Sequence, residues 1–112
     1  MSDGDIVASF EPRAHYRGTP ETLHGGIAAT ALDEMLVWAG ILTERVMSVT
    51  ATLDLKFRSP LSVSERLDVR SRIEERRGRR LVASGEIIAQ GATTAEATGL
   101  LLVTEEIDEL FD

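Results

Sequence analysis

The sequence predicts a single α+β domain, residues 1–112, in which one curved antiparallel sheet wraps round one long central helix. The first observation is an almost wholly apolar stretch, residues 27–42, which predicts the helix. The second is the alternation of apolar and polar residues through most of the remaining chain, which is typical of strands. No second apolar helix is available to pack against the first, so the sheet itself has to cover it.

The first strand and a loop precede the helix. Residues 5–11 alternate loosely and predict a short strand, and residues 12–22, with two prolines and a glycine, predict a loop. The helix is expected to start at Gly25-Gly26, where free backbone N–H groups would point outward. Its apolar residues lie nearly all the way round, which is typical of a helix buried on most faces.

Four strands are predicted after the helix, joined as a meander by turns that include Gly78 and Gly91. They are residues 48–59, 65–75, 79–90 and 92–105. In the first of them Thr50 falls on the polar face, so it is expected to point away from its own helix unless a bulge or a partner chain intervenes. The opposite, apolar face of that strand consists of Val49, Ala51, Leu53, Leu55 and Phe57.

Composition argues against several classes of protein. The formal net charge of −7 argues against a nucleic-acid partner. Cysteine is absent, which excludes disulfides and thiolate metal sites and is compatible with the cytoplasm, where we expect the protein. The two histidines lack acidic neighbours at metal-ligand spacing, so no metal is expected. The N-terminus has no signal-peptide pattern, and the apolar helix is expected to be too short and too interrupted by carboxylates to span a membrane.

The main chemical signal is a pair of carboxylates, Asp33 and Glu34, inside the apolar helix. Such groups are costly to desolvate, and a chain keeps them when they are paired or when they do chemistry. The glycines at the helix start offer N–H donors for developing negative charge, and a poorly solvated carboxylate is a better nucleophile or base. These two parts suit attack on an activated acyl group such as a thioester.

Helix geometry sets a condition on this chemistry. Asp33 lies eight residues beyond Gly25, which is roughly 12 Å along a helix axis. A reacting carbonyl needs its donor and its base each at about 3 Å. The two groups of one chain therefore cannot serve one carbonyl, and an enzyme of this design requires a dimer with antiparallel helices and two shared sites.

Simpler interpretations stay open at this point. The His-Gly-Gly turn can be only a tight entry to the helix, and Asp33 can be a buried residue paired with an arginine. Glu34 points about 100° away from Asp33 round the helix and is expected to support structure, while Met35 and Trp38 are expected in the core. The six arginines between residues 70 and 80 form either a solvated hairpin or a contact for the phosphates of a cofactor.

The motif H-G-G-I-x-A-T-x-L-D-E, from His24 to Glu34, resembles the start of the central helix in hotdog-fold acyl-CoA thioesterases of the PaaI-like and thioesterase-superfamily group. The preceding H-Y-R-G-T-P-E-T-L is similar to the loop before the motif in one subgroup. The later V-T-A-T-L-D-L-K-F-R-S-P, from Val49 to Pro60, is similar to the family's second strand. The resemblance covers nearly the whole chain and implies the hotdog fold.

The resemblance also implies roles for single residues. Asp33 would be the nucleophile or the general base, the Gly25 N–H would polarise the thioester carbonyl, and His24 would shape the turn beside it. Many members carry an asparagine where this chain has Gly18. The substrate-contacting residues implied are Gly26, Thr50, which would position water or substrate, Arg58 and Ser59 near the coenzyme A moiety, and His15, which with Thr50 is a candidate to compensate for the asparagine.

The expected function is hydrolysis of an acyl-CoA to the free acid and the CoA thiol. No cofactor is expected beyond the coenzyme A of the substrate, no membrane partner is expected, and the assembly is expected to be a homodimer or a dimer of dimers. The alternative is a hotdog protein that binds acyl-CoA without turning it over. A hotdog dehydratase or hydratase would need a catalytic histidine paired with an acid in differently spaced motifs, which this sequence does not contain.

Overall fold

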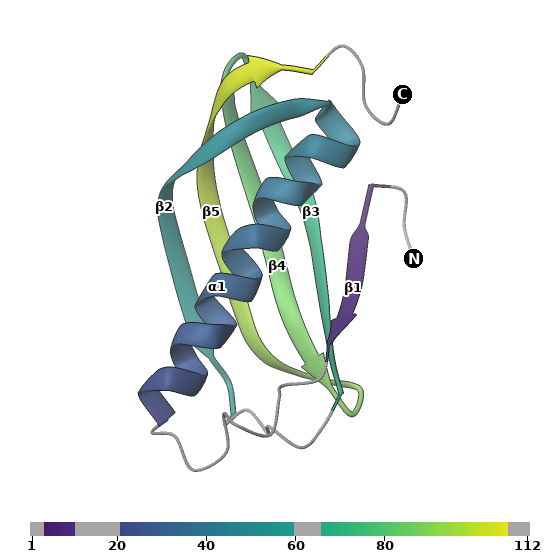
Figure 1. The fold of residues 1–112 in the computed structure, drawn as a ribbon, viewed down its shortest axis with the longest axis vertical. Coiled ribbons are helices and arrows are strands. Elements are labelled where there is room, and N and C mark those ends of the chain that lie inside the picture. Colours follow the sequence, from purple (N-terminus) through teal and green to yellow (C-terminus); the bar gives the residue numbers. More distant parts are fainter. Residues whose placement is uncertain (1–3, 11–20, 60–65, 108–112) are drawn as a thin grey trace.

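A computed structural model describes residues 4–10, 21–59 and 66–107, and the side chains of residue 10 and residues 21–24 lie outside the description. Figure 1 shows one long helix lying diagonally across one face of a single curved sheet, as predicted. All five predicted strands are present. The elements are β1 (Ile6–Phe10), α1 (Glu21–Ala39), the short π-helix η2 (Gly40–Glu44), β2 (Val46–Phe57), β3 (Leu67–Arg77), β4 (Arg80–Ala89) and β5 (Ala92–Glu106).

The five strands are arranged in the order β1-β3-β4-β5-β2, and every neighbouring pair is antiparallel. The predicted meander is therefore wrong in one place, because β2 pairs with β5 and not with β3. The β3–β4 and β4–β5 connections each contain a glycine with positive φ, Gly78 at 58° and Gly91 at 79°, as short hairpin loops require. Strand β2 follows the end of the helix and joins the sheet at its edge beside β5 (Figure 1).

One face of α1 packs onto the sheet, and the opposite face is open in the single chain. Leu32 and Leu36, one helical turn apart, are fully buried against the strands, and Met35 is buried as expected. Trp38, by contrast, is 44% exposed. The predictions of a helix buried on most faces and of Trp38 in the core are wrong, because a single sheet covers only one side of a helix.

The helix lies close to the sheet because the strands beneath it carry small residues. A Cβ atom on Gly99 would lie 2.7 Å from Cδ1 of Leu36, and one on Gly85 would lie 3.2 Å from Cδ2 of the same leucine. The Ser71 hydroxyl donates a 2.7 Å hydrogen bond to the backbone carbonyl of Met35. These contacts set the distance between α1 and the sheet. They therefore also determine where the side chains of the helix lie.

Among the described residues, the segment Gly25–Glu44 has the length and composition of a membrane span, with 20 residues and a hydropathy of 1.3. The expectation that this segment is too short and too interrupted by carboxylates to span a membrane is therefore wrong when length and composition are the only criteria. Leu32 and Leu36 of the same segment pack against the sheet. Packing against the sheet thus accounts for the apolar residues on one face of this segment.

Candidate active site

Helix α1 begins one turn earlier than predicted, at Glu21 and not at Gly25. In a regular α-helix each N–H donates to the carbonyl four residues back, so the Gly25 N–H has a helical partner at Glu21. The expectation that Gly25 and Gly26 supply the free N–H groups of the first turn is therefore wrong. Neither glycine has a side chain, however, and a Cβ on Gly26 would have no neighbour within 4 Å. The backbone of this turn is thus open to approach.

Gly25 and Asp33 lie on one uninterrupted helix, Glu21–Ala39. Their separation along the axis is therefore roughly 12 Å, as the sequence spacing predicts. One chain does not bring these two groups to a single carbonyl.

Asp33 and Thr50 are brought together between α1 and β2. The Thr50 hydroxyl donates a 2.6 Å hydrogen bond to Oδ1 of Asp33, and both side chains are partly buried. A hydrogen bond to an ionised group of this kind is strong and directional, so it orients the carboxylate. No described residue forms an ion pair with Asp33, which leaves the interpretation as a buried aspartate–arginine pair without support in this part of the chain.

A β-bulge turns Thr50 towards the helix, contrary to simple alternation. The pairing of β2 with β5 skips Ala51, which lies between Thr50 and Thr52. This extra residue exchanges the two faces of the strand, so buried or partly buried positions are even-numbered before it and odd-numbered after it. Val49, expected on the inner face, consequently points outward and is 53% exposed.

Phe57, which the sequence placed on the apolar face of its strand, also lies at the site. It pairs with Ala95 on the inner face at the end of β2, yet it is 51% exposed. Its Cζ atom lies 3.7 Å from the position that a Cβ on Gly25 would occupy. The ring therefore lies in contact range of the glycine turn. In the sequence, Phe57 is the last apolar residue of the alternating strand.

Arg58 and Ser59 follow directly and are both exposed. Their N–H groups donate to the carbonyl of Thr94, at 2.7 and 3.2 Å, which fixes the end of β2 against β5. The Arg58 guanidinium donates to a carboxylate oxygen of Glu96 at 2.6 Å. The backbone of these two residues thus lies at the end of β2 that passes Gly25, while the Arg58 guanidinium reaches Glu96 on the sheet face turned away from α1.

The remaining predicted residues are less fully described. His15 and Gly18 lie outside the described residues, and so does the side chain of His24, although its backbone belongs to α1. Glu34 is exposed, and within the described residues it has no ion-pair partner. Its expected structural role therefore has no visible contact in the single chain.

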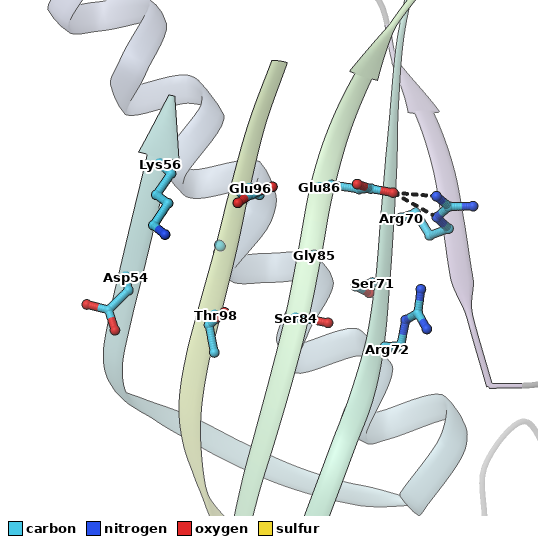
Figure 2. A pocket seen from close by; sticks show the side chains of 11 residues that line it. Asp54, Lys56, Arg70, Ser71, Arg72, Ser84, Gly85, Glu86, Glu96 and Thr98 are labelled. Atoms are coloured by element: carbon cyan, nitrogen blue, oxygen red, sulfur yellow. Dashed lines mark hydrogen bonds and ion pairs between the residues drawn. The ribbon is translucent and has the colours of Figure 1, made fainter. Parts of the chain in front are cut away.

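A hollow of about 330 Å³ lies on the sheet face turned away from α1. Figure 2 shows the side chains that line it. Its lining is polar and of mixed charge. Arg70 donates to Glu86, which also accepts a 3.0 Å hydrogen bond from the Thr93 hydroxyl. The hydrogen bond from Arg70 holds the pKa of Glu86 below its usual value, although partial burial acts in the opposite direction. Since this hollow and Asp33 lie on opposite faces of the sheet, the hollow is not part of the candidate active site.

The arginines between residues 70 and 80 are largely engaged with acceptors of the chain. Arg76 donates to Glu44 at 3.3 Å and to Glu106 at 2.8 Å, and Arg79 donates to the carbonyl of Val103. Of the two interpretations, these contacts favour a solvated hairpin held by ion pairs.

The comparisons with known proteins match this architecture. A family model described as thioesterase superfamily matches residues 21–96. Acyl-coenzyme A thioesterase THEM4 of Bos taurus is 31% identical over 98 residues, which cover 86% of this chain and 40% of the relative, so the chain spans less than half of that protein's length.

Two solved structures have the same fold. The smu.793 protein of Streptococcus mutans UA159, bound to acetyl CoA, superposes with a TM-score of 0.85 at 19% identity, over 94% of this chain and 85% of that one. The E. coli PaaI protein from the phenylacetic acid degradation operon superposes with a TM-score of 0.81 at 18% identity, over 93% and 75% of the two chains. Together with the family match across the helix, the bulged strand and the glycine turn, they show that the chain has the hotdog fold and belongs to the thioesterase superfamily.

Proposed function

We propose that the protein hydrolyses acyl-CoA thioesters to a free acid and the thiol of coenzyme A. The observation that carries the proposal is the Asp33 carboxylate, which the Thr50 hydroxyl holds at 2.6 Å between α1 and β2. The relatives support the substrate class, because one is named an acyl-coenzyme A thioesterase and a structural neighbour contains acetyl CoA.

In the proposed reaction Asp33 acts through Oδ2, since Oδ1 accepts the hydrogen bond from Thr50. As a general base it takes a proton from water while the water oxygen bonds to the carbonyl carbon. The carbon–sulfur bond then breaks, and the proton passes to the leaving thiolate. As a nucleophile, Asp33 instead bonds to the carbonyl carbon, and the carbon–sulfur bond breaks to release the thiolate and leave an acyl-aspartate anhydride. In a second step water hydrolyses the anhydride, which frees the acid, restores the carboxylate and supplies the proton for the thiolate.

Gly25 is the proposed donor to the carbonyl oxygen, where negative charge develops. Because its N–H also has the Glu21 carbonyl as a helical partner, we propose a shared, three-centre hydrogen bond of the kind common near helix ends. The absence of side chains at Gly25 and Gly26 gives the thioester access to this backbone. His24 is proposed to shape the same turn, and Arg58 and Ser59 are proposed to contact the coenzyme A moiety.

The proposed site takes Gly25 and Asp33 from two different chains, because they lie roughly 12 Å apart along one helix. Strand β2 supports this arrangement, since it is an edge strand with a neighbour on one side only in the described chain. Long edge strands are normally covered. Pairing with β2 of a second copy about a two-fold axis would set the α1 helices antiparallel. We propose a homodimer with two shared sites, and association of two dimers into a tetramer.

A panel of acyl-CoA thioesters, assayed by thiol release, tests the proposed function. We expect turnover of at least one member of the panel by the purified protein. Tight binding of coenzyme A in a calorimetric titration, with no thiol release from any member, would identify a binding protein instead. Hydration of an enoyl-CoA would identify a hydratase.

Mixing two inactive variants tests whether the site is shared. Asp33→Asn removes the catalytic carboxylate, and Gly25→Val places a branched side chain over the N–H donor and against Phe57. In a mixed dimer one site carries both defects and the other carries neither, so re-equilibrated mixtures are expected to regain about a quarter of wild-type activity. Native mass spectrometry confirms that subunits have exchanged, and an exchanged mixture that stays inactive would show that each chain builds its own site.

Removal of the Thr50 hydroxyl is expected to lower kcat by about 10- to 100-fold. This factor corresponds to the free energy that a hydrogen bond to a charged group usually contributes. Thr50→Val keeps the shape of the side chain and removes the donor, whereas Thr50→Ser keeps the donor. Steady-state kinetics should therefore show loss with valine and recovery of most of kcat with serine. Equal kcat values for the valine variant and the wild type would exclude Thr50 from the orientation of Asp33.

A further inference from the structure

The described site residues form two pairs at different points along α1. Thr50 is hydrogen-bonded to Asp33 near the middle of the helix, at 2.6 Å. Phe57 lies beside Gly25 near its start, with its Cζ atom 3.7 Å from the position of an added Cβ. If Gly25 and Asp33 of one site come from different chains, Phe57 enters the site together with Gly25 and opposite Asp33 of the partner subunit.

The contact with Gly25 places Phe57 within reach of the substrate. A carbonyl oxygen that accepts from the Gly25 N–H lies about 2.9 Å from the nitrogen, and its carbon lies about 1.2 Å further on. The two substituents of that carbon are the sulfur and the α-carbon of the acyl group. The ring lies at van der Waals distance from the position that a Cβ on Gly25 would occupy, so we expect one of these substituents to pack against it.

The surroundings of Phe57 indicate which substituent this is. On the inner face of the sheet its neighbours are apolar, with Ala95 opposite it in β5 and Leu55 two residues earlier in β2. The polar pair Arg58–Glu96 is exposed. An apolar acyl group gains from contact with the inner surface, whereas the amide-containing pantetheine chain is better placed towards the polar residues and solvent.

We propose that Phe57 is a specificity-determining residue that packs against the α-carbon of the acyl group and excludes acyl groups branched at that carbon. The inference rests on the proposed thioesterase function. An unbranched α-carbon that packs against the ring carries only hydrogens beside the chain, whereas a second substituent would compete with the ring for the same space. The preferred substrates are accordingly acyl-CoA thioesters with an unbranched α-carbon.

The test compares the straight-chain acyl-CoA that turns over fastest with its 2-methyl isomer of equal carbon number. Wild type is expected to favour the straight chain, and Phe57→Ala is expected to lower the ratio of kcat/KM values roughly tenfold, the usual scale for one methyl group in an apolar pocket. Phe57→Leu should fall between them. The control is Leu102→Ala, which truncates another exposed apolar residue, 40% exposed, in β5 on the opposite sheet face and should leave the ratio unchanged.

Each other outcome contradicts the inference in a distinguishable way. An equal fall of kcat/KM with both substrates would place the ring against the pantetheine chain or assign it to folding alone. A wild-type preference for the branched isomer would overturn the proposed selectivity. Failure of the wild type to hydrolyse any acyl-CoA would instead remove the proposed function, and with it the basis of this inference.

Heterodimers purified through two affinity tags test the subunit to which Phe57 contributes. In a dimer of one Asp33→Asn chain and one Phe57→Ala chain, the active site contains an intact Phe57, so wild-type selectivity is expected. In a dimer of a wild-type chain and a chain with both substitutions, the active site contains the alanine, so the altered ratio is expected. The reverse result would place Phe57 in the same site as Asp33 of its own chain.

Discussion

Replacement of Asp33 by asparagine is expected to lower kcat for thioester hydrolysis on the order of 10²–10⁴-fold, the usual contribution of a general base. Asparagine has nearly the same shape, and its carbonyl oxygen can still accept the hydrogen bond from Thr50. The amide, however, can neither take a proton from water nor attack a thioester. Thiol release from the best acyl-CoA of the panel measures the loss.

Glu34→Gln is the matched control for this prediction, because it makes the same chemical change on the adjacent, exposed residue of the helix. It is expected to retain activity within a few-fold of wild type. The asparagine of the first variant would restore aspartate if it deamidated, whereas alanine cannot. Asp33→Ala should therefore be at least as inactive as Asp33→Asn. Retention of wild-type kcat by the alanine variant would remove Asp33 from the mechanism.

Truncation of Leu36 to alanine is expected to lower the free energy of unfolding by about 2–5 kcal/mol, because a fully buried side chain leaves a cavity between helix and sheet. Gly99→Ala alone should cost about 1–3 kcal/mol through overpacking, since its Cβ would lie 2.7 Å from Leu36 Cδ1. The two changes together should cost less than their sum, because the new methyl group occupies space that the leucine has vacated. Urea unfolding at one fixed protein concentration measures all three variants.

Gly26→Ala provides the control for the effect of adding a methyl group. A Cβ at this exposed helical position has no neighbour within 4 Å, so alanine should stabilise the protein by up to about 1 kcal/mol. Strict additivity of Leu36→Ala and Gly99→Ala would contradict the close packing of helix on sheet.

The sequence predicted the strands well, because each has one buried face and alternation records that face residue by residue. The same alternation does not indicate which strands are neighbours in the sheet, so the pairing of β2 with β5 was not predicted. A helix with apolar residues all the way round likewise does not indicate which of its faces packs against the sheet. Trp38 was assigned to the core on hydrophobicity alone, although the positions that face the strands are those of Leu32 and Leu36.

For the site, Asp33 and Gly25 stand out in the sequence because a carboxylate and a pair of glycines are unusual in an apolar helix. Their shared use by two chains is a consequence of helix rise alone. Contacts between distant segments were not visible in this way. The orientation of Thr50 depends on the bulge at Ala51, and the role of Phe57 depends on where the end of β2 passes the helix.

The bulge at Ala51 means that strand length, as much as residue identity, is inherited with this site. Ala51 and Thr52 are consecutive exposed residues, so deletion of either one would restore regular alternation and leave Thr50 on the inner face. Loss of the bulge without a deletion would have the opposite effect. With Leu53 and Leu55 kept inside, Val49 would face the aspartate with its methyl groups and the threonine would face solvent. A relative without the bulge therefore keeps the threonine against the aspartate only if it has one residue fewer in this strand, and an alignment that omits this gap would match the threonine to the wrong face.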